Sequence, residues 1–202
     1  QSKNIIMKVV EFVIDENNED FGVYAISLVD SPAIEEEFMY FSDKQQFATV
    51  DTDERVVMGA VMIPDLEIMR VDNKGEKYKC WFSKATVKDI MQRYMKQSKH
   101  QSTTIEHATT VQGITTVESW IVADSKKDKT QAFGLEYPVG TWVACMKIDN
   151  EEVWQNYIKE GIVKGFSVEG NFGEKKVEMS EQDFINAIVK IIQDDENTTN
   201  IK

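Results

Sequence analysis

The stretch KEGIVKGFSVEGNF, residues 159–172, has the pattern of an apolar strand that carries one serine between two glycines. Ser167 and Glu169 lie two residues apart, so the period of a strand puts both side chains on one face. Gly165 and Gly170 weaken a strand but permit another backbone to approach closely. We therefore expect something to lie against this strand, such as a substrate peptide or an oxyanion.

Outward from this strand, the pattern predicts an α+β fold that is mostly β. Ser83 is the expected N-cap of a helix over 84–98, and Asn150 or Asp149 caps a short helix over 151–160 that ends at Gly161. Ser180 caps an amphipathic helix over 181–195. Apolar runs separated by turn residues predict strands over 5–14, 21–29, 55–65, 76–82, 140–148, 162–172 and 174–179.

The chain divides into three parts by composition. Residues 1–54 are expected to form a strand pair, joined by a turn over 15–20, and an acidic linker. Residues 55–193 are expected to form one domain, in which strands and helices follow a regular pattern. Its last two strands are expected to pair as a hairpin through Gly173. Residues 194–202 are predicted to be a disordered tail.

Composition excludes several classes of function. The net charge of -12 would repel a phosphate backbone, so we expect no nucleic-acid partner and favour a basic one. The sequence has no run of about 18 apolar residues that could span a membrane and no secretory signal peptide. Cys80 and Cys145 are predicted to be two buried thiols in a reducing cytoplasm, and we expect no metal and no cofactor.

Residues 103–124 have the pattern of a β-hairpin around Gln112 and Gly113. If the turn is centred between these two residues, two residues face one another across the hairpin when their sequence numbers add up to 225. His107 then lies opposite Glu118. A slip of one residue would remove this pairing.

A hydrolase needs a nucleophile and a base, and histidine is the usual base because its pKa lies near working pH. His100 lies in a polar loop and is expected to be exposed and idle, whereas His107 is a candidate base or a structural histidine. Ser167 is a candidate nucleophile or a small residue where the sheet packs tightly. Its GFSVEG context differs from the GxSxG elbow of the α/β-hydrolases, which excludes that class.

TTIEHA (103–108), VESWIVAD (117–124) and GTWVACMKIDNEEVWQNYIKEGIVKGFSVEGNF (140–172) together resemble the XkdF-like phage serine proteases, which belong to the prohead proteases. The resemblance extends over 55–185. Prohead proteases are similar to the herpesvirus assemblins, which implies a β-barrel surrounded by helices. The resemblance implies that Ser167 is the nucleophile and His107 the base.

The third catalytic residue departs from the assemblin pattern, because no histidine follows Ser167. A carboxylate must replace it. Glu118 is the first choice because of the hairpin register, Glu178 the second because it would face Ser167, and Glu169 the third because it shares a face with Ser167.

Family resemblance further implies a protease that acts in the host cytoplasm inside the procapsid, on scaffold and major capsid proteins, with self-processing. Activation by dimerisation is implied too. The apolar stripe over 184–192 is a candidate dimer contact, although we favour its packing on the barrel. The alternative function is a non-catalytic structural or scaffold-like virion module that keeps the same barrel.

Overall fold

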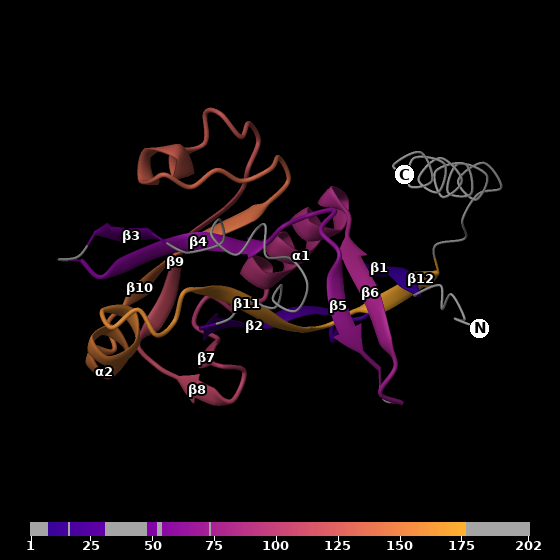
Figure 1. The fold of residues 1–202 in the computed structure, drawn as a ribbon, viewed down its shortest axis with the longest axis horizontal. Coiled ribbons are helices and arrows are strands. Elements are labelled where there is room, and N and C mark those ends of the chain that lie inside the picture. The colour runs from indigo at the N-terminus through magenta and orange to yellow at the C-terminus, as the bar shows by residue number, and fades with distance from the viewer. Residues whose placement is uncertain (1–7, 16, 31–47, 52–53, 73, 177–202) are drawn as a thin grey trace, which may run out of the picture.

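The computed structural model describes residues 8–15, 17–30, 48–51, 54–72 and 74–176 of the chain. Within these residues it contains three four-stranded sheets and the helix α1 (Lys84–Lys96) (Figure 1). The sheet orders are β12-β1-β6-β5, β3-β4-β10-β9 and β11-β2-β7-β8. The strands are β1 Val9–Val13, β2 Gly22–Val29, β3 Ala48–Asp51, β4 Val56–Met62, β5 Ile68–Val71, β6 Lys77–Phe82, β7 Thr103–Ile105, β8 Thr109–Val111, β9 Ile114–Ile121, β10 Trp142–Ile148, β11 Gly165–Asn171 and β12 Gly173–Lys176.

This mostly β architecture with few helices agrees with the predicted α+β class. In the part of the chain that the structure describes, none of the three sheets closes on itself. The expected barrel is therefore not confirmed.

The main core lies between the sheet that contains β2, the sheet that contains β10 and helix α1 (Figure 1). Along β10, Trp142, Ala144 and Met146 point into this core, while Val143 and Cys145 point into a second apolar cluster on the other face. Burial on both faces explains why β10 is a continuous apolar run and does not alternate with polar residues. Each fully buried large side chain contributes roughly 1.5–3 kcal/mol of transfer free energy.

The first two strands do not form the expected pair. β1 pairs with β6 and β12, whereas β2 lies between β7 and β11 in another sheet. The segment between them is attached to α1, because the Arg93 guanidinium donates to the carbonyls of Asp15, Asn18 and Phe21 at 3.1, 2.7 and 2.9 Å. The division at residue 54 stays a prediction, but β2 shares a sheet with strands that follow that point.

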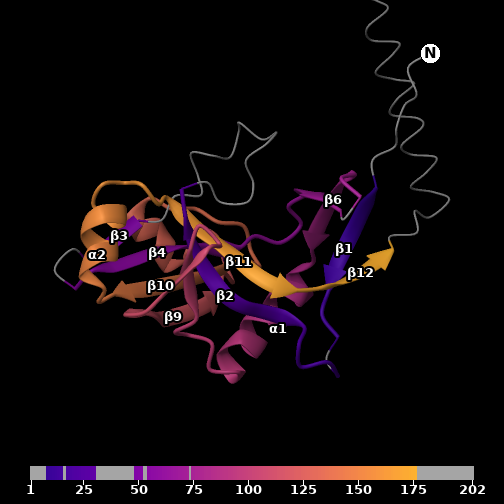
Figure 2. The ribbon, with the colours of Figure 1, turned by 90° about the horizontal axis from the view of Figure 1, so that it is seen from below.

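β11 and β12 do not form the expected hairpin either. The chain leaves the end of β11 and continues as β12 into the sheet that contains β1 (Figure 2). β12 pairs with β1 from Val10 to Val13. One extended segment therefore contributes a strand to each of two sheets.

The two predicted helices that fall in described residues are confirmed. The Ser83 hydroxyl accepts the Thr86 N–H at the start of α1, and the Asn150 side chain accepts the Val153 N–H at the start of α2 (Glu151–Val153). α2 continues as one π-helical turn, η3 (Trp154–Ile158), and Gly161 follows with a φ of 64°. The predicted helix over 181–195 and the tail lie outside the described residues. None of the described helices has the length and apolar character that a membrane span requires.

Gly170, in the 159–172 stretch, lies against backbone that leaves no room for a side chain. A Cβ atom at this position would lie 2.6 Å from the Gly22 carbonyl oxygen and 2.6 Å from Phe172 Cζ. The backbone that approaches Gly170 thus belongs to the neighbouring strand β2 and not to a substrate.

We predict that Gly170→Ala lowers the free energy of unfolding by about 1–3 kcal/mol, because the added methyl group overlaps backbone that cannot shift without disturbing β2. Urea denaturation measures this change. Gly173→Ala is the matched control, since its nearest atom is Phe21 Cε1 at 3.2 Å, on a side chain that can move. Equal losses in the two variants would contradict the prediction.

Cys80 and Cys145 are both free and fully buried. Burial raises the pKa of each thiol to about 11. We predict that neither reacts with iodoacetamide at pH 8 in the native protein, where about one thiol in a thousand is thiolate. Both are expected to react in denaturant, as mass spectrometry of the alkylated chain would measure. Rapid modification of the native protein would contradict this.

Candidate active site

Ser167 lies in a row of three hydroxyl side chains that crosses the β11-β2-β7 sheet. It is the Cα partner of Ser27 on β2, and Ser27 is the Cα partner of Thr104 on β7. The row occupies the face opposite Phe166 and Leu28, which point into the core. Ser27 is fully buried and Ser167 is 5% exposed, so the row is a shielded polar strip on the sheet.

His107 lies in the tight turn that connects β7 to β8. Glu106 and His107 both have positive φ, 51° and 55°, and the Ala108 N–H donates to the Ile105 carbonyl at 3.0 Å. Positive φ at both positions and this hydrogen bond describe a β-turn of the primed type within a three-residue loop, 106–108, because Ile105 pairs with Thr109. Positive φ costs roughly 1–2 kcal/mol per residue for side chains other than glycine, so other contacts must stabilise the turn.

Contacts from β2 stabilise this turn. The Glu106 N–H donates to the Leu28 carbonyl at 3.0 Å, and Glu106 Oε1 accepts the Asp30 N–H at 2.5 Å. The His107 N–H donates to Ser27 Oγ at 3.0 Å. Ser27 is therefore both the strand neighbour of Ser167 and the hydroxyl that holds the backbone of His107.

The imidazole of His107 contacts Glu169, with 3.3 Å between Nδ1 and Oε1. The same oxygen accepts a hydrogen bond from the Thr104 hydroxyl. The Glu169 side chain is 18% exposed and the His107 side chain 41% exposed. A proton on Nδ1 that donates to this carboxylate leaves Nε2 with a free lone pair, which is the tautomer that a general base requires.

The Ser167 hydroxyl has no hydrogen-bond partner among the described residues. Ser167 also lines a small pocket of about 50 Å³ between β11 and the segment 61–70. Apart from Ser167 and Arg70, the side chains around this pocket are apolar.

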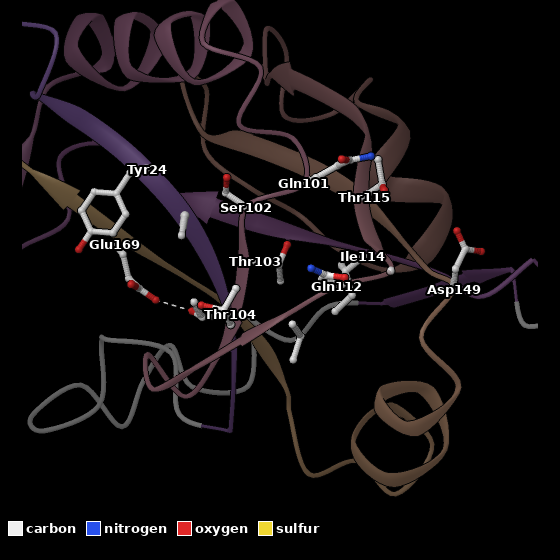
Figure 3. A pocket seen from close by; sticks show the side chains of 14 residues that line it. Tyr24, Gln101, Ser102, Thr103, Thr104, Gln112, Ile114, Thr115, Asp149 and Glu169 are labelled. Carbon is white, nitrogen blue, oxygen red and sulfur yellow. Dashed lines mark hydrogen bonds between the residues drawn. The ribbon is translucent and has the colours of Figure 1, made fainter.

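A larger depression of about 820 Å³ begins at Glu169 and extends along β7 and the 110–115 segment to Asp149 (Figure 3). Most of the side chains that line it are hydroxyls and amides. It lies on the same side of the sheet as Glu169 and Thr104. Thr104 is the member of the polar strip that lines this groove.

The chain matches one known protein family over most of its length. Residues 43–177 match the family described as "Putative phage serine protease XkdF". The chain belongs to this family. No curated protein and no solved structure matches the chain.

The XkdF-family match includes Ser167, His107, Glu118 and Glu169, so membership alone does not choose between the two glutamates. Their positions differ. Glu118 lies on β9, opposite Cys145 of β10, and forms an ion pair with Lys129. Lys129 also lies over the Trp120 ring, 4.6 Å from its centroid.

The predicted hairpin register that aimed Glu118 at His107 is wrong. β8 pairs with β7, whereas β9 pairs with β10 in another sheet. The reason is the Gly113 carbonyl, which accepts the N–H groups of Asp149 and Asn150 at 2.7 and 3.0 Å and so directs the chain into the second sheet. The turn that forms the hairpin lies instead at 106–107, where neither residue is a glycine or an asparagine.

Glu178 lies outside the described residues. The expectation that it faces Ser167 rested on a β11–β12 hairpin, and β12 pairs with β1 instead. His100 lies before β7, and its carbonyl accepts the Thr116 N–H.

Sequence reasoning missed Ser27 and Thr104, the two hydroxyl residues that hold His107 and Glu169. Strand alternation in YAISLV (24–29) puts Ser27 on the face opposite Ile26 and Leu28, which was the available signal. Its partner strand could not be read from the sequence. None of the three arginines contacts His107 or Glu169 in a described interaction; Arg55 pairs with Glu151, and Arg93 holds the 15–21 segment.

We predict that Ser27→Ala lowers the free energy of unfolding by about 1–3 kcal/mol, because the His107 N–H loses its acceptor in a partly buried site. Hydrogen exchange should show faster exchange of the His107 amide than in the parent protein. Ser125→Ala, at a half-buried serine in a loop, should change stability by less than about 0.5 kcal/mol. Unchanged protection of the His107 amide in Ser27→Ala would contradict the role given to this hydrogen bond.

Proposed function

We propose that this chain is a serine endopeptidase in which Ser167 is the nucleophile, His107 the general base and Glu169 the residue that orients the imidazole. The observation that supports it is the Glu169–His107 contact at 3.3 Å, on the same sheet face as Ser167. Membership in a family of phage serine proteases supports the same reaction class. Glu169 replaces Glu118 in this proposal, because Glu118 is paired with Lys129 in another sheet.

In this mechanism His107 Nε2 takes the proton of the Ser167 hydroxyl as Oγ attacks the scissile carbonyl carbon. The imidazolium then donates that proton to the leaving amine, and water hydrolyses the acyl-enzyme. Glu169 stabilises the imidazolium, and Thr104 fixes the carboxylate by donating to its oxygen. Transfer requires Nε2 and Oγ to come within about 2.6–3.2 Å, a contact that often forms only when substrate is bound.

The exposure of the imidazole leaves it free to reorient toward Ser167. Its side chain is 41% exposed, and its backbone stays fixed by Ser27. The proposal requires a side-chain rotamer that brings Nε2 to the Ser167 hydroxyl while Nδ1 keeps Glu169 as its partner.

The physiological substrates that we propose are phage scaffold and major capsid proteins, cleaved inside the procapsid in the host cytoplasm, together with self-processing. Assembly of two or more copies is part of this proposal, because an enzyme that acts only in a closed shell needs a signal that it has been packaged. Family membership supports the phage context.

The proposed triad predicts how fast each variant is labelled by a fluorophosphonate, a reagent that reacts only with an activated serine. Ser167→Ala should abolish labelling of the wild-type site, and His107→Gln should slow it by about 10²–10⁴-fold because the base is lost. Glu169→Gln should slow it by up to about 10⁴-fold, as for loss of the orienting carboxylate in other triads. In-gel fluorescence with time gives the rates.

Glu118→Gln is the matched control and should label at the wild-type rate. Circular dichroism checks that each variant is folded. Equal labelling of Ser167→Ala and wild type, or slow labelling of Glu118→Gln with unchanged labelling of Glu169→Gln, would contradict the assignment. Mass spectrometry of wild type and Ser167→Ala, each incubated with a phage scaffold protein, then tests substrate cleavage and self-processing; identical fragments, or none, would favour the non-catalytic virion module.

A further inference from the structure

We propose that the groove between Glu169 and Asp149 is the channel that receives the peptide substrate, and that it selects an extended segment carrying a basic side chain over one carrying an acidic side chain. This inference rests on the proposed function, because it assigns the substrate class of the same site. The observations that carry it are the charge of the groove, its rigid frame and the aromatic ring at its entrance (Figure 3).

The groove has a volume of about 820 Å³, which lies in the range of clefts that hold ligands. Among the residues that the structure describes, the charged ones that line it are Glu169 and Asp149, and no described lysine, arginine or histidine does so. Between them lie uncharged hydroxyl and amide side chains, among them Ser102, Thr104 and Gln112. These groups can donate to and accept from a peptide backbone in either direction.

The Asp149 end of the groove carries a carboxylate that is open to solvent and has a long ion pair with Lys147. The Asp149 side chain is 62% exposed and has Lys147 Nζ 3.6 Å from Oδ1. That ammonium also donates to the Glu54 carbonyl at 2.6 Å, so it is held by a second acceptor outside the groove. An arriving cation is therefore attracted by Asp149, and the net charge of -12 on the whole chain acts in the same direction.

The frame of the groove is rigid at this end. The Gly113 carbonyl accepts two backbone N–H groups, from Asp149 and Asn150, and the Asn150 side-chain amide donates to the Gln112 carbonyl at 2.9 Å. A Cβ on Gly113 would approach Asn150 N to 3.2 Å, which shows how closely the two segments pack. A preformed groove loses less conformational entropy when a peptide binds.

A β-bulge presents Tyr24 at the Glu169 end. Glu169 pairs with Ala25 and Gly170 pairs with Val23, so Tyr24 is the extra residue on β2. Bulges of this kind redirect a side chain, and they occur often beside active sites. Tyr24 is 46% exposed and its ring lies near Glu169 (Figure 3), where an aromatic face and a carboxylate together suit a lysine or arginine side chain.

β8 explains why the occupant should be extended. It is the last strand of the β11-β2-β7-β8 sheet in the described part of the chain, so its outer edge is not paired within that sheet. Thr110 and Val111 of β8 line the groove. An extended peptide can add to such an edge through backbone hydrogen bonds, while its side chains enter the groove.

The test measures peptide binding by the Ser167→Ala variant, which removes cleavage from the measurement. The probes are two fluorescein-labelled dodecapeptides of Gly, Ser, Thr and Gln that differ only in a central pair, Lys-Lys or Glu-Glu. Fluorescence anisotropy should give a dissociation constant at least about threefold lower for the lysine peptide, the effect of one partly exposed ion pair. The preference should shrink in 0.5 M salt, where exposed charges are screened.

Asp149→Lys, added to the same background, should abolish or reverse the preference. The control Glu160→Lys makes the same change of net charge at an exposed site outside the groove and should retain it. Equal affinity for the two peptides, no binding of either, or equal effects of Asp149→Lys and Glu160→Lys would overturn the proposal.

Fluorophosphonate labelling of the wild-type chain distinguishes a failure of the peptide groove from a failure of the proposed protease activity. Labelling at Ser167 without a lysine preference would overturn the channel and leave the protease. A lysine preference that depends on Asp149, in a chain that does not label, would support the peptide groove and overturn the protease.

Discussion

The hydrogen bond from the His107 backbone to the Ser27 hydroxyl is the contact on which the arrangement of the candidate site depends. It joins a turn with two left-handed residues to a fully buried serine on the middle strand of the sheet. Little in the local sequence favours this turn, because positive φ is uncommon for any residue other than glycine and Glu106 has no special tendency to adopt it. Backbone strain at a site that other contacts hold in place is typical of functional regions.

Ser27 also explains how residues from distant parts of the chain meet. β2 is hydrogen-bonded to β11 on one side and to β7 on the other, so it separates the strand of Ser167 from the strand that leads to His107. The imidazole crosses over β2 and reaches Glu169, two residues from Ser167 on β11. Thr104 of the polar strip and the Glu169 end of the large groove both lie at this crossing.

Local features of the fold could be predicted from the sequence, while the strand partners could not. The N-caps at Ser83 and Asn150 were readable because a cap depends on residues within one turn of the helix. The period of two correctly put Ser167 and Glu169 on one face. All three expected hairpins failed for the same physical reason: distant groups decide the path, such as Arg93 on the 15–21 carbonyls and the N–H groups of Asp149 and Asn150 on Gly113. The 106–107 turn lacks the glycine or asparagine that usually reveals a tight turn, so the sequence alone favours a hairpin around Gly113, which aims Glu118 and not Glu169 at His107.

The position of β2 determines how late during synthesis its sheet can form. The sheet that carries Ser167 combines a strand near the start of the chain, one from its middle and one that ends at Asn171. Contacts over such long separations form late, because the intervening loops must close first. A ribosome-bound nascent chain that has not yet emerged as far as β11 lacks Ser167, the proposed nucleophile, so the proposed reaction cannot begin before that strand is made.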